Sequence, residues 1–274
     1  MNLKNYLIAI DLDDTLVTNF DKYDEKSFSL LKKLSKDNYI VIATGRPFRS
    51  SKYYYDLLKL NTPIINYNGA LLHHPKDSTF PKKTLHIDKK LLLKFINDNQ
   101  EIIETVFCEI GDNIYLHKNN EYVGPYLHTD GGNLTIGNLE KSLPGNPNGA
   151  IVFSKIGTEN HLIEYVESEF KGNIKIRIWH ANEIVVSELY NSLTTKANAL
   201  KEVAKYYNVP KEKIIAFGDG HNDIEMIKYA HIGVAMENGH PDLLKVAQFS
   251  TKSVKESGVY HFLIDLLEKN QEKH

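Results

Sequence analysis

A short apolar segment near the start of the chain, residues 6–10, runs directly into an acidic segment with carboxylates at Asp11, Asp13 and Asp14. Apolar and β-branched residues in a run of this length predict a buried strand. Side chains two residues apart on an extended segment point the same way, so Asp11 and Asp13 can share one site. Carboxylates that meet at the end of a buried strand favour a hard cation and a chemical task. An acidic surface turn is the alternative interpretation, because loops often collect aspartate.

The segments that follow alternate between apolar runs and stretches with helical spacing. Strands are predicted at residues 6–10, 39–43 and 63–65. Strands that alternate with helices are typical of a parallel sheet covered on both faces, so we expect an α/β, Rossmann-like core. Ligands of such sheets bind beyond the carboxyl ends of the strands, which is where Asp11, Thr44 and Asn68 fall.

The pattern changes in the middle of the chain. Residues 106–117 and 174–188 each contain two apolar runs separated by a short polar turn, which predicts hairpins of an antiparallel sheet. The alternation of strands and helices then resumes, with strands predicted at 214–217 and 232–236 and a helix over 194–207. We therefore predict a core domain built from residues 1–81 and 190–274, with residues 82–189 inserted as a separate α+β domain.

Composition excludes several classes of protein. The formal net charge is −2 and no basic block stands out, so neither nucleic acid nor an anionic membrane is an expected partner. No apolar run approaches the ~20 residues of a membrane span, and the first residues do not form a signal peptide. The single cysteine, Cys108, lies in an apolar run and is expected to be a core thiol in a reducing compartment, so we expect a cytoplasmic protein. The oligomeric state stays open.

A second group of polar residues follows the strand predicted at 214–217, namely Asp219, Asn222 and Asp223. Lys196 stands near the start of the preceding predicted helix. Acidic loops at two strand ends, a hydroxyl and a lysine suit phosphoryl transfer without a nucleotide. Taken singly, each residue has an ordinary alternative, since exposed lysines are common and Asp often caps a helix.

Four motifs in this order resemble the haloacid dehalogenase superfamily. They are DLDDTL at 11–16, ATGR at 43–46, the lysine at 196 and GDGHND at 218–223. The large insert, NGA at 68–70 and VAMENG at 234–239 are similar to the Cof-type sugar-phosphate phosphatases, which carry an α/β cap. The resemblance implies a Mg²⁺-dependent phosphatase of small phosphorylated metabolites, such as sugar phosphates, whose cap determines substrate specificity.

The resemblance also implies the catalytic roles of individual residues. Asp11 would be the nucleophile that forms an aspartyl-phosphate, and Asp13 would be the general acid and then the general base. The metal ligands would be Asp11, the backbone carbonyl of Asp13 and Asp219, with Asp223 supporting the metal shell. Lys196 would neutralise the phosphoryl oxygens.

The remaining implied contacts concern the phosphate and the leaving group. The hydroxyl of Thr44 and the amides of Leu12 and Gly45 would bind the phosphoryl oxygens, and Asn222 would orient the phosphate or the lysine. The residues predicted to contact the rest of the substrate are Arg46, Asn68, Tyr115 and His117.

Two positions depart from the usual family pattern, and two other functions stay open. Asp14 and Ala197 each stand where glycine is frequent in the family. Neither change removes a reacting group. The alternatives are a phosphomutase or phosphotransferase on the same scaffold and a non-catalytic regulatory homologue. The intact Asp11, Asp13, Lys196 and Asp219 argue against the regulatory homologue.

Overall fold

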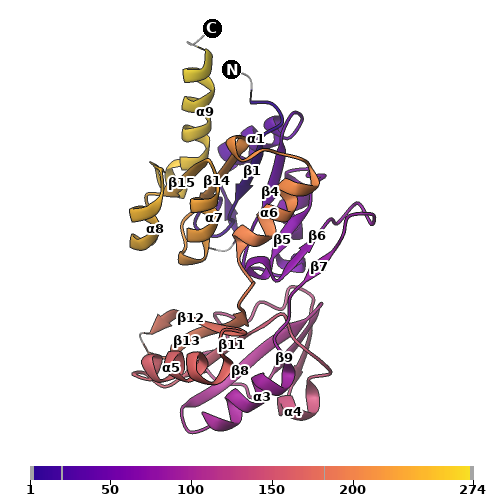
Figure 1. Ribbon diagram of the computed structural model, residues 1–274, viewed down its shortest axis with the longest axis vertical. Helices are drawn as coiled ribbons and strands as arrows, with labels where there is room; N and C mark the ends of the chain where they lie inside the picture. Colours follow the sequence, from indigo (N-terminus) through magenta and orange to yellow (C-terminus); the bar gives the residue numbers. More distant parts are fainter. Residues whose placement is uncertain (1–2, 20, 182, 272–274) are drawn as a thin grey trace. The chain divides into compact units, whose positions relative to one another are not determined.

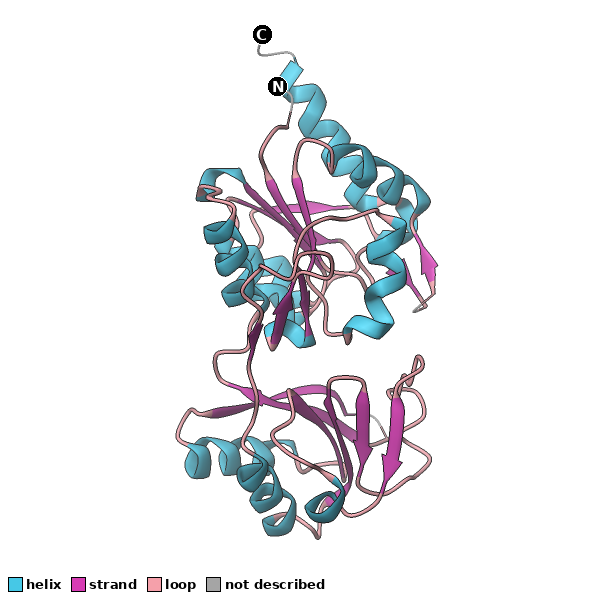
Figure 2. Cartoon of the chain, turned by 90° about the vertical axis from the view of Figure 1, so that its right-hand side faces the viewer, coloured by secondary structure: helices cyan, strands magenta, loops and turns pink. Residues whose placement is uncertain are grey.

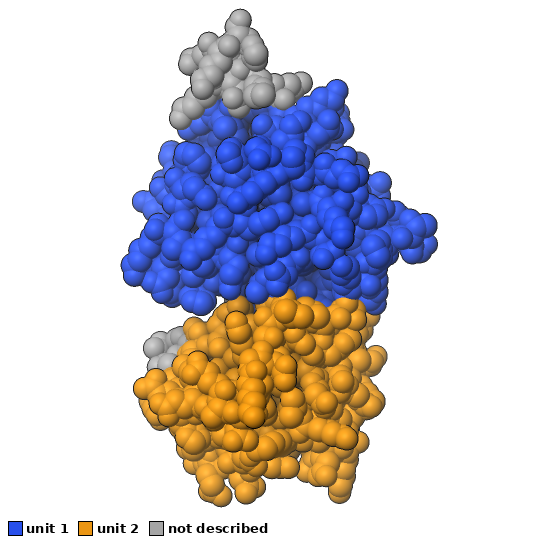
Figure 3. Space-filling view, in the orientation of Figure 1, with its two compact units in different colours: residues 1–83, 195–274 blue, residues 84–194 orange. Residues whose placement is uncertain are grey.

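The computed structural model of the protein describes residues 3–19, 21–181 and 183–271 (Figure 1). The chain forms two compact units (Figure 3). Unit 1 comprises the chain up to Lys83 and from Thr195 onward, and unit 2 runs from Thr84 to Thr194. Unit 2 is therefore continuous in sequence, whereas unit 1 is assembled from the two ends of the chain.

Unit 1 contains a five-stranded sheet whose strands all run parallel. In spatial order the strands are β16 (Phe249–Thr251), β15 (Ile232–Met236), β14 (Ile214–Gly218), β1 (Leu7–Ile10) and β4 (Tyr39–Ile42). The predicted parallel sheet is thus confirmed. Since β1 pairs with both β14 and β4, the residues that follow these three strands emerge at one edge of the sheet.

Helices cover both faces of this sheet (Figure 2). Alternate residues of its strands therefore belong to two different hydrophobic clusters. In β1, Ile8 and Ile10 belong to one cluster and Leu7 and Ala9 to the other. The first face is covered by α1 (Glu25–Leu34), α2 (Phe48–Leu57) and α9 (Gly258–Gln271). The second is covered by α6 (Lys196–Tyr206), α7 (Ile224–Tyr229) and α8 (Pro241–Val246). Burial on both faces explains why β1, β4, β14 and β15 consist of apolar residues and glycine.

Two local predictions need correction. Strand β5 (Ile64–Asn66) is joined to the large sheet by a parallel bridge from Ala43 to Ile65, and its residues pack in the clusters on both faces of that sheet. Its longer ladder is with β6 (Leu71–His73), in a small sheet that also contains β7 (Lys83–Thr84), because the chain turns back immediately after β5. Helix α6 begins at Lys196 rather than at residue 194, because the Thr195 side chain accepts a hydrogen bond from the amide of Asn198 and caps the helix.

Unit 2 contains a six-stranded sheet of mainly antiparallel strands, in the order β10-β9-β8-β11-β13-β12. The strands are β8 (Ile103–Ile110), β9 (Asn113–Leu116), β10 (Asn133–Ile136), β11 (Gly149–Ser154), β12 (Ile174–Ala181) and β13 (Val185–Asn191). Both predicted hairpins are present, as β8 with β9 and β12 with β13. Asn182, which the sequence predicts in the turn of the second hairpin, lies outside the described residues. The α+β character predicted for this part of the chain is therefore confirmed.

Helices α3 (Lys89–Asp98) and α5 (Glu159–Phe170) pack on one face of the unit 2 sheet. Cys108 lies buried in the same cluster, and burial raises the pKa of its thiol to about 12, which confirms the predicted core thiol. A short helix, α4 (Leu139–Ser142), follows β10. Among the described residues, no helix combines the length and the apolar character that crossing a membrane requires.

Candidate active site

The polar residues that follow the central strands of unit 1 come together at the carboxyl edge of the sheet. Asp11 follows β1, Thr44 lies two residues after β4, and Asp219 follows β14 directly. Asp11 and Thr44 are buried, with 6% and 0% of their surfaces exposed. This edge therefore collects charged and polar groups in a protected position, as expected for a parallel sheet.

Lys196 is the centre of this group. Its ammonium nitrogen lies 2.6 Å from Oδ1 of Asp11 and 2.7 Å from Oδ1 of Asp223. The lysine side chain is fully buried, so this is a desolvated charge network rather than a surface ion pair. The two carboxylates raise the pKa of Lys196 despite its burial, and the lysine is therefore held in its charged form.

Asp223 also organises the loop that carries Asp219. Its second oxygen accepts hydrogen bonds from the amides of Asp219, at 3.1 Å, and Gly220, at 2.9 Å. The loop is closely packed, because a Cβ atom at Gly218 would lie 2.5 Å from the Asp223 carboxyl carbon. Both Asp223 oxygens thus have partners inside the protein, which fits a supporting role better than that of a direct metal ligand.

Thr15 is a site residue that the motif analysis did not assign. Its hydroxyl donates a hydrogen bond of 3.0 Å to Oδ1 of Asp219, and the residue is fully buried. A hydroxyl residue directly after the acidic run of residues 11–14 was the available signal in the sequence. Thr15 lies in the loop that follows β1, and its hydroxyl orients the carboxylate of Asp219, which follows β14.

Burial and mutual repulsion dominate the electrostatics of the carboxylates. Burial raises the pKa of Asp11 well above its usual range; Lys196 opposes this effect, while Asp223 and Asp219 reinforce it. Burial and the neighbouring Asp223 raise the pKa of Asp219 to about 7. Three carboxylates against one lysine leave an excess of negative charge that a cation would relieve.

The residues present fit a hard divalent cation. Asp11, Asp219 and Asp223 each offer a carboxylate oxygen, and these oxygens lie within 4.8 Å of one another. Oxygen ligands of this kind are those that Mg²⁺ and Ca²⁺ prefer. Zinc, by contrast, usually takes nitrogen or sulfur ligands, which this cluster lacks among the described residues.

The carboxylate of Asp13 is not part of this cluster but pairs with Arg46. The guanidinium Nε lies 2.9 Å from Oδ2, and Nη2 lies 2.5 Å from Oδ1. Asp13 is therefore positioned near the cluster but directed to a different partner. Any metal ligand from this residue would be its backbone carbonyl.

The loops that follow β4 and β5 are joined to each other and to the loop that follows β14. The amide of Asn68 donates to the carbonyl of Thr44 at 3.0 Å, and Asn222 Nδ2 donates to Asn68 Oδ1 at 2.8 Å. Asn68 has a left-handed backbone with φ of 55°. Gly45 permits the close approach, since a Cβ there would lie 3.2 Å from the Asn68 amide oxygen. Asn222 thus orients Asn68 in this structure.

Three more residues that were predicted to contact the phosphate or the substrate have identifiable contacts within the protein. Leu12 is fully buried, and its carbonyl accepts the amides of Leu16 and Val17. In unit 2, His117 Nδ1 accepts the amide of Leu139 at 3.3 Å. Tyr115 packs against the cluster under α3 and α5.

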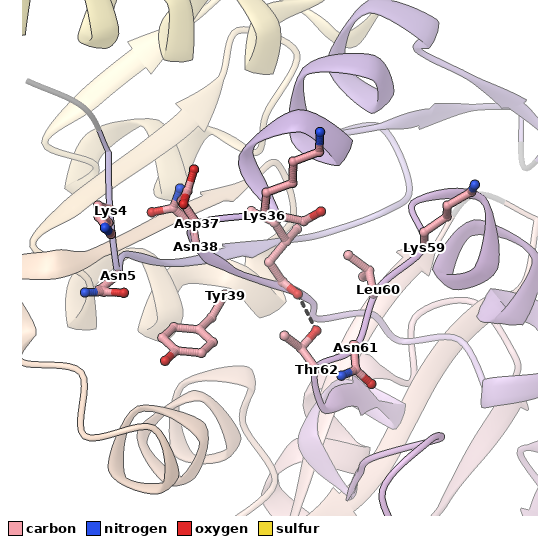
Figure 4. Close-up of a pocket in the computed structure, with 12 residues that line it drawn as sticks. Lys4, Asn5, Lys36, Asp37, Asn38, Tyr39, Lys59, Leu60, Asn61 and Thr62 are labelled. Carbon is pink, nitrogen blue, oxygen red and sulfur yellow. Dashed lines mark hydrogen bonds between the residues drawn. The ribbon is translucent and has the colours of Figure 1, made fainter.

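A separate pocket of about 400 Å³ lies at the other edge of the sheet (Figure 4). It is lined by Asn5, which precedes β1, by Tyr39, the first residue of β4, and by Thr62, which precedes β5. The hydroxyl of Thr62 donates to the carbonyl of Ile40 across its base. None of the carboxylates of the acidic cluster lines this pocket.

Comparison with known proteins agrees with this geometry. The sequence profile of the haloacid dehalogenase-like hydrolase family matches residues 8–263. The chain belongs to this family, the haloacid dehalogenase-like hydrolases, and is a phosphatase of the Cof type.

Two curated relatives of the chain come from Bacillus subtilis. One, named 5-amino-6-(5-phospho-D-ribitylamino)uracil phosphatase YitU, is 34% identical and covers 96% of this chain and 98% of its own length. The other, named phosphatase YwpJ, is 29% identical and covers 95% of this chain and 99% of its own length. Both matches extend over unit 1 and unit 2.

Solved structures share the fold. A haloacid dehalogenase-like hydrolase from Bacteroides thetaiotaomicron has a TM-score of 0.79 at 22% identity and covers 96% of this chain and all of its own. SMU.1108c from Streptococcus mutans has a TM-score of 0.81 at 22% identity, with 97% of this chain and all of its own covered.

Proposed function

We propose that the protein is a Mg²⁺-dependent phosphatase that hydrolyses small phosphorylated metabolites through a phosphoryl group carried on Asp11. The observation that carries the proposal is the position of the Lys196 ammonium between Asp11 and Asp223, with the Asp219 carboxylate beside them. A buried carboxylate next to a fixed cation suits nucleophilic attack on a phosphate, provided that the negative charges are offset.

In the first step, an oxygen of Asp11 attacks the phosphorus and the bond from phosphorus to the leaving oxygen breaks. Asp13 donates a proton to that oxygen, so the product leaves as an alcohol. Lys196 and the hydroxyl of Thr44, with the amides of Leu12 and Gly45, stabilise the phosphoryl oxygens. The phosphoryl group then remains on Asp11 as a mixed anhydride.

In the second step, water attacks the phosphorus of the aspartyl-phosphate. Asp13, now ionised, accepts the proton of the water, and the bond from phosphorus to Asp11 breaks. Inorganic phosphate leaves, the Asp11 carboxylate is regenerated and Asp13 returns to its protonated form. One residue thus serves as acid and then as base, which is why its position matters for both steps.

The carboxylates of Asp11 and Asp219, with the backbone carbonyl of Asp13, would hold the Mg²⁺ ion, and Asp223 would support them. The bound ion would offset the charge that otherwise separates a carboxylate nucleophile from a phosphate dianion. The excess of negative charge at Asp11, Asp219 and Asp223 supports this assignment.

We infer that the substrate is a phosphate ester of a sugar or a sugar alcohol. The supporting observation is the name of the relative YitU, which describes a phosphatase of a phosphorylated ribitylamino compound. Unit 2 is proposed to act as the substrate-specificity domain, through residues that include Tyr115 and His117. A cytoplasmic location is proposed as well, since the one cysteine is free and buried.

The test is phosphate release from a panel of phosphorylated sugars, sugar alcohols and nucleotides, with and without Mg²⁺. Chelation should stop turnover and added Mg²⁺ should restore it. Asp11→Asn should abolish turnover of p-nitrophenyl phosphate while circular dichroism shows an intact fold. Activity retained by Asp11→Asn would remove Asp11 from the reaction. Phosphate transfer to an added sugar, without release of inorganic phosphate, would identify a phosphotransferase instead.

A further inference from the structure

The side chains of Arg46 and Asp13 form a two-point contact at the edge of the acidic cluster. Nε of Arg46 donates to Oδ2 of Asp13 at 2.9 Å, and Nη2 donates to Oδ1 at 2.5 Å. A fork of two parallel hydrogen bonds fixes the plane of a carboxylate as well as its distance, which a single ion pair does not.

Arg46 is itself held from several directions. Its guanidinium carbon lies 5.4 Å from the ring centre of the buried Tyr54, and Nη1 donates to the carbonyl of Ser50 at 3.4 Å. Its amide donates to the hydroxyl of Thr44, and its carbonyl accepts from the side chain of Asn66. The arginine side chain is only 14% exposed. The guanidinium is therefore a rigid partner for Asp13.

Asp13 has no comparable support of its own. Its side chain is 33% exposed, and within the part of the chain that the structure describes every hydrogen bond found at its carboxylate comes from Arg46. A partly exposed carboxylate without this fork would sample several rotamers. Arg46 thus determines where the Asp13 carboxylate points.

We propose that Arg46 is a positioning residue that holds Asp13 in the orientation needed to protonate the leaving oxygen and to activate the attacking water. The inference rests on the proposed function and changes the role expected for Arg46 from substrate contact to support of Asp13. Arg46 acts through Asp13 and need not touch the substrate.

This role predicts a dependence on the leaving group. An alkyl oxygen leaves only with a proton, whereas a nitrophenolate is stable enough to leave without one. Loss of Arg46 should therefore slow an alkyl phosphate much more than an aryl phosphate. A misplaced catalytic group costs roughly 100-fold in rate.

The experiment compares kcat for an aryl ester, p-nitrophenyl phosphate, with kcat for an alkyl ester, glycerol 2-phosphate. Both are measured in the wild-type, Asp13→Asn, Arg46→Met and Arg46→Lys enzymes. We expect Arg46→Met to lose about 100-fold on the alkyl ester and less than about 10-fold on the aryl ester, with KM unchanged. Arg46→Lys should keep most of the defect, because an ammonium cannot form the fork. Lys52→Met, which removes a surface cation from α2, the helix that follows Arg46, is the matched control and should leave both rates unchanged.

A second measurement covers the case in which Arg46→Met folds poorly. Guanidinium ion added to Arg46→Ala should restore turnover of the alkyl ester, whereas ammonium should not. Equal losses on both esters, a raised KM with unchanged kcat, or full activity of Arg46→Lys would overturn the inference.

The proposed function fails separately. Wild-type enzyme without Mg²⁺-dependent phosphate release would overturn the proposed function. If Asp13→Asn shows the leaving-group bias and Arg46→Met does not, only the role proposed for Arg46 is overturned.

Discussion

The ammonium nitrogen of Lys196 lies 2.6 Å from Oδ1 of Asp11, so the first residue of α6 is paired with the residue that follows β1. The two residues are 185 positions apart in the sequence, and unit 2 lies between them in the chain. The pair is buried, and its charges are therefore not screened by solvent. Correct assembly of unit 1 from both ends of the chain is a condition for any chemistry at Asp11.

Lys196→Met should abolish most activity and destabilise the protein. The change leaves Asp11 and Asp223 as buried carboxylates without their cation, which costs about 3 to 5 kcal/mol in comparable buried pairs. We expect kcat to fall by about 100-fold or more. Urea unfolding and steady-state kinetics measure the two effects. Lys201→Met, on the exposed side of the same helix, is the control and should change neither.

Gly69→Ala should impair catalysis by displacing the start of α6. Gly69 has φ of +105°, and a Cβ there would lie 2.4 Å from the carbonyl oxygen of Thr195, the residue before Lys196. Gly157→Ala is the matched control, since its φ is +83° but no atom lies within 4 Å of the new Cβ. Both changes should cost about 1 to 2 kcal/mol through backbone strain, and Gly69→Ala should cost more in total because its Cβ also clashes with a backbone oxygen. Only Gly69→Ala should also lower kcat, and equal kinetics in the two variants would remove the proposed link to Lys196.

The positions of Asp11 and Asp219 relative to each other were predictable from the sequence because they depend on the topology of the sheet, whereas Lys196, the first residue of α6, was placed with them by the family resemblance. Residues that follow parallel strands meet at one edge, and apolar runs identify the strands without knowledge of side-chain conformation. The same reasoning accounts for the parallel sheet of unit 1 and the hairpins of unit 2.

The partners of Asp13 and Asn68 were not predictable, because they depend on rotamers and on loop conformation. Alternation along an extended segment places Asp13 on the side of Asp11, but the path of the loop between β4 and α2 determines that Arg46 reaches its carboxylate. Asn68 has a left-handed backbone, and its side chain accepts a hydrogen bond from Asn222, whereas the sequence predicted a contact with the substrate. Strand β5 keeps one parallel bridge to the large sheet but pairs along its length with β6, because its apolar residues fit either pairing.

Thr15→Val should weaken Mg²⁺ binding with little effect on the fold. The substitution keeps the shape of the side chain but removes the hydroxyl that donates to Asp219 Oδ1 at 3.0 Å. Loss of such an orienting hydrogen bond reduces metal affinity by about 10- to 100-fold. Titration of activity with Mg²⁺ measures the change. Thr62→Val is the control: it removes a buried hydroxyl that bonds to Ile40 far from the cluster, and it should leave the Mg²⁺ dependence unaltered.

Mg²⁺ binding should release a proton below neutral pH, because burial and Asp223 raise the pKa of Asp219 to about 7 in the metal-free protein. At pH 6 the ion must displace the proton of Asp219, so apparent affinity should rise with pH. Calorimetry at pH 6 and at pH 8, in two buffers of different ionisation enthalpy, counts the protons, and the count should be lower at pH 8. The Asp219→Asn protein should release fewer protons at pH 6 than the wild type, because only the raised pKa of Asp11 remains.

The same raised pKa has a consequence for stability, with the opposite sign to an ordinary salt-bridged carboxylate. Between the unfolded-state pKa of roughly 4 and the folded-state pKa of about 7, the unfolded chain ionises Asp219 while the folded chain keeps it protonated. The contribution of Asp219 therefore destabilises the metal-free protein as pH rises through this interval, and Mg²⁺ should reverse the loss.

Thermal unfolding of wild type and Asp219→Asn from pH 5 to 8 measures this loss of stability. We expect Asp219→Asn to be the more stable of the two at pH 8 without metal, and the less stabilised by added Mg²⁺. A wild-type protein whose advantage over Asp219→Asn grows with pH in the absence of metal would contradict the raised pKa.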